Sequence, residues 1–159
     1  MSLLGETVFT MVRFLICWIV VGLVGLTGCS GGGSGPVKHP VVGRFVVNGT
    51  PAEQVAVTFH HADGEKAGEY RYATAVTDQE GRFELSTTGD KDGAVEGTYR
   101  VTFSWLSSKD LDAYDMLSGA YSDPSQSKFT VTVPMTGAEL PPFELNVPES
   151  QIRRPSSRR

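Results

Sequence analysis

The most ligand-like side chains of the sequence lie in one short segment, where His60, His61 and Asp63 follow an apolar run. Imidazole and carboxylate groups are common ligands of zinc and of other transition metals. Successive side chains of a strand point to opposite faces, so adjacent histidines in a strand cannot bind one ion without distortion. We therefore expect solvated residues at a strand end and no metal site. His39 lies in a Gly/Ser-rich stretch and is no better placed to bind a metal ion.

An acidic cluster, Asp90-Lys91-Asp92-Gly93 with Glu96 nearby, is similar to half of a calcium-binding loop. A complete loop of the EF-hand type needs further oxygen ligands at set spacing and a terminal bidentate glutamate. Lys91 would also place a positive charge inside the cluster. We therefore expect a glycine-assisted connection between strands here.

The N-terminus contains an apolar run that follows a positive charge and ends near a cysteine. Thirteen apolar or uncharged residues, 14–26, follow Arg13; a membrane-spanning helix needs about 20, so they suit the core of a signal peptide. The motif that ends this run resembles a bacterial lipobox, Leu26-Thr27-Gly28-Cys29. The resemblance implies cleavage after residue 28, acylation of Cys29 and attachment to the bacterial cell envelope. Ser30 favours the outer membrane by analogy with Gram-negative lipoproteins. The alternative is an uncleaved anchor or a buried helix in which the cysteine is incidental.

Catalytic patterns are missing from the sequence. No serine has the Gly-x-Ser-x-Gly setting of a nucleophile elbow. Cys17 is expected to leave with the leader and Cys29 to carry lipid, so neither serves Cys/His catalysis. Asp78 and Glu80 are expected to stabilise a turn. The sequence thus predicts a protein that is not an enzyme and needs no cofactor.

Apolar and polar residues alternate with a period of two from residue 41 onward, which is typical of strands with one buried face. Turn signals such as Asn48-Gly49 separate the runs. We expect seven strands, at residues 41–47, 53–60, 70–77, 82–86, 98–105, 129–133 and 142–147. This pattern predicts an all-β fold, a seven-stranded antiparallel β-sandwich. Its core is predicted to contain Phe59, Phe83, Leu85, Val101, Phe103, Val131 and Leu145.

The order of turn and core motifs adds a family resemblance. The motifs are V-x-G-x-x-x-x-N-G-x-P from Val41, V-T-D-x-x-G-R-F-x-L from Val76 and D-G-A-x-x-G-x-Y-x-V from Asp92. Together they resemble the carboxypeptidase regulatory-like domain, a transthyretin-like sandwich common in small bacterial lipoproteins. The resemblance covers residues 41–148 and implies a fold, with no shared catalytic residues.

The chain therefore divides into four predicted segments. They are a signal peptide (1–28), the lipidated cysteine with a Gly/Ser linker (29–40), the β-sandwich (41–148) and a basic tail (149–159). The tail is expected to be disordered, so deleting residues 151–159 should leave the melting temperature unchanged. Residues 38–150 contain nine Lys and Arg against seventeen Asp and Glu, a net charge of −8 that argues against binding nucleic acid.

The connection over residues 106–128 is long, and it contains more apolar residues than a loop without a structural or binding role would need. Leu111, Tyr114 and Leu117 have the spacing of one face of a short helix. This helix either caps an open end of the sandwich or, with Tyr114 and Tyr121, forms a surface that contacts a partner.

We expect a non-catalytic, membrane-tethered binding or structural module of the cell envelope, with an envelope protein or a glycan as its partner. The alternative is a small hydrolase or a metal-binding accessory protein.

Overall fold

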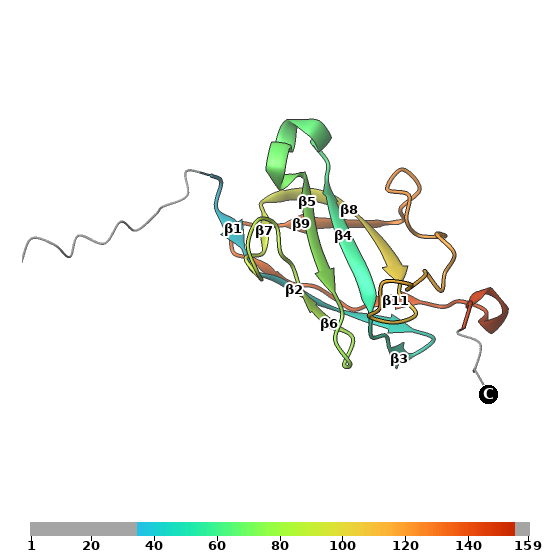
Figure 1. Ribbon diagram of the computed structural model, residues 1–159. Coiled ribbons are helices and arrows are strands. Elements are labelled where there is room, and N and C mark those ends of the chain that lie inside the picture. The colour runs from blue at the N-terminus through green and yellow to red at the C-terminus, as the bar shows by residue number, and fades with distance from the viewer. Residues whose placement is uncertain (1–34, 155–159) are drawn as a thin grey trace, which may run out of the picture. The chain divides into compact units, whose positions relative to one another are not determined.

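Alternating apolar and polar residues form a strand at each of the seven predicted places in the computed structural model, which describes residues 35–154 (Figure 1). Four further strands of two residues each bring the number in this part of the chain to eleven. The predicted all-β class is confirmed, and the predicted number of strands is too low. The elements are β1 (Lys38–His39), β2 (Val41–Val47), β3 (Thr50–Pro51), β4 (Val55–His61), the 3-10 helix η1 (Gly64–Arg71), β5 (Tyr72–Val76), β6 (Arg82–Glu84), β7 (Ala94–Val95), β8 (Gly97–Trp105), β9 (Phe129–Val133), β10 (Ala138–Glu139), β11 (Phe143–Leu145) and the 3-10 helix η2 (Glu149–Gln151).

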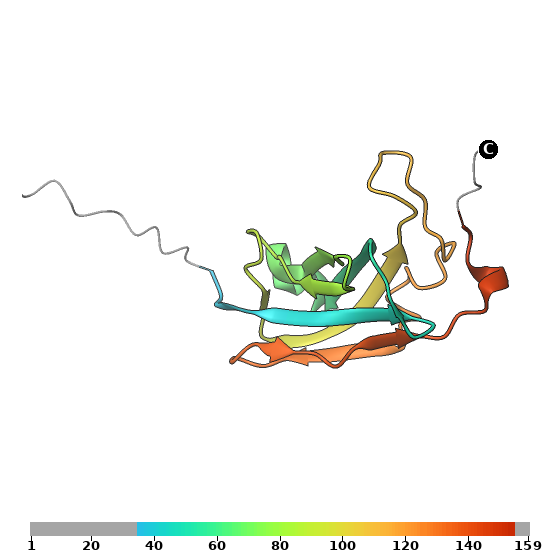
Figure 2. The ribbon, with the colours of Figure 1, turned by 90° about the horizontal axis from the view of Figure 1, so that it is seen from below.

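The strands form three sheets. One has the antiparallel order β5-β4-β8-β9, a second is built around β2, and β1 pairs with β7 in a small ribbon. In the second sheet β2 pairs antiparallel with β3 and β6 but parallel with β10 and β11, which lies alongside β2 in Figure 2. The prediction of purely antiparallel pairing is therefore wrong at β2. Parallel pairing needs a crossover, and the passage of the chain from β9 to β10 supplies one.

Aromatic rings from the two larger sheets meet in a common core. The ring of Phe45 on β2 lies edge-on to that of Phe103 on β8, with centroids 4.6 Å apart. Phe143 on β11 lies edge-on to Phe59 on β4 at 6.4 Å. Such pairs contribute beyond the area that they bury. Two sheets that share one aromatic core hold each other in place.

Six of the seven predicted core residues are buried, and Val131 is the exception. It is half-buried on β9, an edge strand of its sheet, where Val133 takes the buried position. An edge strand has a neighbour on one side only, so a residue near its middle is covered less completely.

The predicted turns are confirmed by backbone geometry. Asn48 and Gly49 have φ values of 51° and 77°, the left-handed pair that a tight hairpin between β2 and β3 requires. The side chain of Asn48 also donates to the carbonyl of Val147 and accepts from its amide, both at 2.8 Å. Asn48 therefore forms the turn and also hydrogen-bonds to the segment that follows β11.

The linker predicted over residues 30–40 is shorter than expected. Lys38 and His39 form β1 and pair with Val95 and Ala94 of β7. The ammonium group of Lys38 also lies 2.7 Å from a carboxylate oxygen of Asp92. The coil prediction is wrong for these two residues, because they find partners distant in the sequence.

The tail predicted to be disordered over residues 149–159 is ordered as far as residue 154. Ile152 is 6% exposed and belongs to the core. The amide of Arg153 donates to the carbonyl of Met116 at 2.8 Å, and its guanidinium lies 4.4 Å from the centre of the Tyr114 ring. The tail is basic overall, but it contains one apolar side chain, that of Ile152, which packs into the core. Residues 155–159 lie outside the described part.

Candidate functional site

A row of three side chains crosses the outer face of the four-stranded sheet. Val55, Val57 and Phe59 of β4 face the core, so His60 faces outward. The residues directly opposite His60 are Tyr72 on β5 and Arg100 on β8. Strand register therefore brings an aromatic ring, an imidazole and a guanidinium together.

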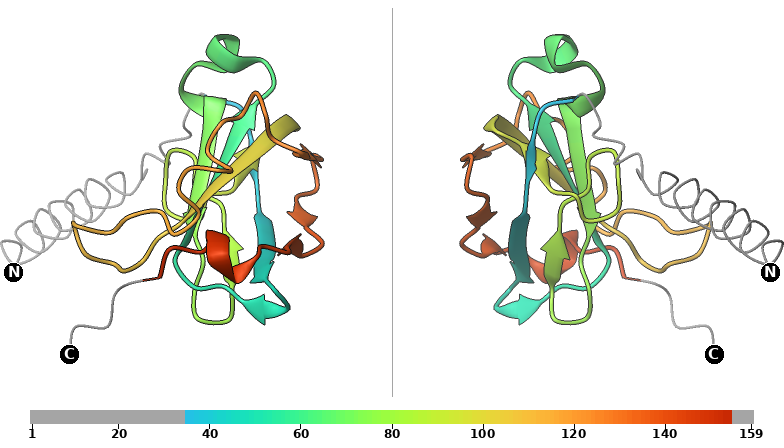
Figure 3. Two further views of the ribbon diagram at one scale, coloured as in Figure 1. Left: turned by 90° about the vertical axis from the view of Figure 1, so that its right-hand side faces the viewer. Right: turned by 90° about the vertical axis from the view of Figure 1, so that its left-hand side faces the viewer.

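This row forms the floor of a depression of about 480 Å³. Helix η1 contributes one wall through Gly64, Glu65 and Arg71, and stands beyond the ends of β4 and β5 in Figure 3. Pro124 and Ser125 contribute the other wall. The volume lies within the range of small-molecule sites. We call this depression the row pocket.

Internal contacts hold the side chains of the row pocket in place. The ring of His60 has Nε2 2.7 Å from the hydroxyl of Thr102 and lies edge-on to Tyr72 at 5.3 Å. Burial lowers the pKa of His60, so its imidazole is neutral at pH 7. The guanidinium of Arg100 donates to the carbonyls of Pro124 and Ser125, both at 3.3 Å. The pocket thus presents ordered hydrogen-bonding groups and an aromatic edge.

The two histidines point to opposite faces of β4, as predicted, but the prediction that they are solvated is wrong for His61, whose side chain is only 10% exposed. The ring of His61 lies edge-on to Tyr99, a fully buried residue, at 4.9 Å. The amide of Asp63 donates to Nδ1 of His61 at 3.1 Å. Among residues 35–154, no three His, Cys, Asp or Glu side chains gather in a way that would hold a metal ion.

The carboxylate of Asp92, in the cluster that is similar to a calcium loop, is already bound by other groups of the protein. Its carboxylate accepts the amides of Thr87 and Gly89 at 2.7 and 2.8 Å, as well as the ion pair with Lys38. Burial favours a neutral Asp92, but hydrogen bonds from Lys38, Thr87, Gly89 and Thr88 outweigh it and hold its pKa well below the usual range. The carboxylate closes the loop between β6 and β7, as the prediction of a structural connection requires.

Asp78 also makes the predicted turn. One of its carboxylate oxygens accepts the amides of Glu80 and Arg82 at 3.0 and 2.8 Å. Gly81 completes the turn with a φ of 71°.

The short helix predicted within residues 106–128 does not form. The carboxylate of Asp115 accepts the amides of Trp105, Leu117 and Gly119 and so imposes a turn. Ser118 and Gly119 then take positive φ values of 52° and 78°, which end any helix. Leu111, predicted to lie on the helix face, is fully exposed.

Tyr114 and Tyr121 both pack against the core. The ring of Tyr121 stacks on Phe103 at 4.9 Å, and Tyr114 lies beneath Arg153. The segment between β8 and β9 that contains both tyrosines lies at the end of the domain where η2 also lies (Figures 1 and 2). Their role as partner contacts stays a prediction. Among residues 35–154, no helix combines the length and apolar character that crossing a membrane requires. Cys29, the predicted lipidation site, lies outside the described residues.

Sequence reasoning singled out His60 but missed Tyr72 and Arg100. The three residues lie on separate strands, and only the register makes them neighbours. A sequence signal existed in the alternation, which places Tyr72 and Arg100 at polar positions of their strands, but it does not say which strands pair.

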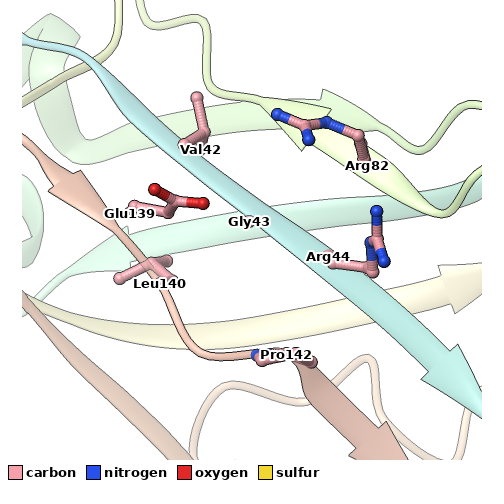
Figure 4. Close-up of a pocket in the computed structure, with 7 residues that line it drawn as sticks. All are labelled: Val42, Gly43, Arg44, Arg82, Glu139, Leu140 and Pro142. Atoms are coloured by element: carbon pink, nitrogen blue, oxygen red, sulfur yellow. The ribbon is translucent and has the colours of Figure 1, made fainter.

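A second depression, of about 270 Å³, lies beside β2 on the other sheet (Figure 4). It contains none of the side chains predicted to be functional. Its charged lining residues are Arg44, Arg82 and Glu139, and we call it the arginine groove.

Comparisons with known proteins identify no family. No family model and no curated protein matches the chain. Among solved structures, the chain is similar to part of a 9R-lipoxygenase from Cyanothece PCC8801, at 13% identity over 70% of this chain and with a TM-score of 0.38. The chain spans 17% of the length of that enzyme. At this level of similarity, no property of the lipoxygenase is transferred to the chain.

Proposed function

We propose that the chain is a lipid-anchored, non-catalytic binding module of the bacterial cell envelope, and that the row pocket is its ligand site. The Leu26–Cys29 motif supports the anchor, with the outer membrane as the location favoured by Ser30. The observation that carries the binding role is the alignment of Tyr72, His60 and Arg100 in one cross-strand row. Tyrosine and arginine are enriched at binding surfaces.

We further propose that the two larger sheets are the transthyretin-like sandwich that the sequence motifs resemble. The seven strands at the predicted places would be its framework, and β1, β3, β7 and β10 would be additions to it. The aromatic core shared between the two sheets supports this interpretation.

The ligand that fits the row pocket best is a glycan. Next to the pocket floor, Thr74, Thr58 and Thr102 form a second cross-strand row of short hydroxyl side chains, which keeps this face flat. A sugar ring offers many hydroxyl groups and an apolar face. Neutral His60, Arg100 and the exposed Tyr72 match both features by hydrogen bonding and ring contact.

Sedimentation of the detergent-solubilised full chain with purified cell-wall sacculi tests the glycan role. We expect Tyr72→Ala and Arg100→Gln to abolish co-sedimentation. Leu111→Ala, which removes a fully exposed side chain elsewhere, is the matched control and should retain it. Equal binding by all variants would exclude the row pocket. Failure of the unmodified chain to bind sacculi would exclude this glycan.

Two further measurements test the rest of the proposal. Cys29→Ala should abolish labelling with palmitate, and continued labelling would exclude the anchor. Stoichiometric metal in the purified protein, or ester or amide hydrolysis lost in His61→Ala, would contradict a non-catalytic module.

A further inference from the structure

The arginine groove exists because the parallel pairing beside β2 contains one extra residue. Ala138 and Glu139 pair with Val41 and Val42, whereas Phe143 pairs with Phe45. Two residues of β2 therefore face three residues of the neighbouring segment, which is a β-bulge. Two of these three, Pro141 and Pro142, have no N–H to donate to β2. The segment bends away there, and the groove opens beside Gly43 and Arg44 (Figure 4).

Two arginines are among the residues that line this groove, and their guanidinium groups lie on the side of β2 away from Glu139 (Figure 4). Arg44 on β2 and Arg82 on β6 are directly opposite each other in the antiparallel register, so both side chains lie on the same face. Like charges placed directly opposite each other destabilise a sheet. The fold therefore keeps an arrangement that costs it stability.

Neither arginine is neutralised within the described part of the chain. Arg44 and Arg82 are exposed, and neither takes part in an ion pair found in residues 35–154. The other four arginines of this part each have a partner: Glu65 for Arg71, two carbonyls for Arg100, Tyr114 for Arg153 and Glu149 for Arg154. In a body this acidic, two adjacent arginines without an acidic partner indicate a place for an external anion.

We propose that the arginine groove binds a phosphate group, with Arg44 and Arg82 as its two donors. The paired N–H groups of one guanidinium bind both oxygens of a carboxylate, so a carboxylate is satisfied by a single arginine. A phosphate has enough acceptor oxygens to bind two guanidinium groups in this way at once. The volume of about 270 Å³ suits a small phosphate-bearing group. This site lies on a different sheet from the row pocket, so it is independent of the proposed glycan binding.

Glu139 gives the proposed site its selectivity. Its carboxylate lies across β2 from the two guanidinium groups in Figure 4. It repels a bare dianion and accepts a hydrogen bond from a hydroxyl or ammonium group that the ligand carries beside its phosphate. The class of ligand is therefore a phosphate ester with such a donor, either as a lipid headgroup or as a soluble molecule.

Calorimetric titration of the detergent-solubilised full chain with inorganic phosphate tests the site. We expect Arg44→Gln and Arg82→Gln each to weaken binding by about tenfold or more, the effect of losing charge-assisted hydrogen bonds. Glu139→Gln should strengthen it severalfold. Lys66→Gln makes the same change of charge elsewhere and should leave it unchanged. Acetate, tested in parallel, should bind more weakly than phosphate.

Melting temperatures show whether each variant is still folded, so that a loss of phosphate binding is not mistaken for a loss of structure. Arg44→Gln and Arg82→Gln remove a repulsion, so both should melt no lower than the unmodified chain. Unchanged phosphate affinity in these folded variants would overturn the proposal, as would weaker phosphate binding in Glu139→Gln.

Phosphatidylglycerol micelles distinguish the two sources of phosphate. If the ligand is a headgroup, micelles should bind about tenfold more tightly than glycerol phosphate in solution, and Arg44→Gln should remove that advantage. Equal affinities that both depend on Arg44 would assign the site to a soluble ester. Binding of both probes without dependence on Arg44 would overturn the site.

Discussion

Removing the docked C-terminal segment should destabilise the domain, although the sequence predicts no effect. The change is a stop after residue 150, compared with a stop after residue 154. The shorter chain loses Ile152, which is 6% exposed, and the hydrogen bond from the amide of Arg153 to the carbonyl of Met116. The longer chain keeps both. The two truncations therefore differ in one small, well-defined set of contacts.

The expected magnitude follows from those contacts. Truncating a buried isoleucine to alanine costs about 2–5 kcal/mol, and a backbone hydrogen bond contributes about 1 kcal/mol. Ile152 lies near the end of the chain, where its surroundings relax after it is removed, so the lower part of the range applies. A loss of about 2–3 kcal/mol lowers the melting temperature of a domain of this size by on the order of 10 °C.

Circular dichroism melts of the two truncated chains measure this difference. Ile152→Ala in the full chain should reproduce most of the loss. Arg154→Ala should cause little, because it breaks only an exposed ion pair with Glu149. Equal melting temperatures for the two truncations would refute the docking of residues 149–154 and restore the sequence-based prediction of a separable tail.

Three further substitutions test the core and the pH dependence. Phe103→Ala should cost about 3–5 kcal/mol in denaturant unfolding, because the ring is buried among Phe45, Tyr121 and Phe129; a loss under about 1 kcal/mol would contradict that packing. Asp92→Asn should lower the melting temperature at pH 7, and the difference should narrow progressively below about pH 4, since a carboxylate with a depressed pKa contributes its full stabilisation above the ordinary carboxyl pKa and loses it as the pH falls further toward the pKa of the folded state. Burial raises the pKa of Tyr99 to about 12, so its neutral hydroxyl stabilises the fold below pH 10 and this contribution is lost as the pH rises toward 12. Tyr99→Phe should therefore be less stable at pH 7 but lose less stability between pH 9 and pH 11; parallel losses would contradict this.

The row pocket and the arginine groove show why site residues were harder to predict than strands. His60 stood out by its type, but Tyr72 and Arg100 become its neighbours only through the register of β5, β4 and β8. The groove depends on a one-residue shift between two segments about a hundred positions apart in the sequence. Pro141-Pro142 marks the place where that shift occurs, but two prolines alone do not say which strand lies beside them.

The sequence by itself determined the strands, the hairpin at Asn48-Gly49 and the turn at Asp78, because alternation and turn chemistry act over a few neighbouring residues. Tertiary structure alone decided the parallel pairing of β10 and β11 with β2, the docking of Ile152 and the irregular path of residues 106–128. These features depend on segments that meet only after the chain has folded, and a single carboxylate such as that of Asp115 then overrides a local helical pattern by capturing three amides at once.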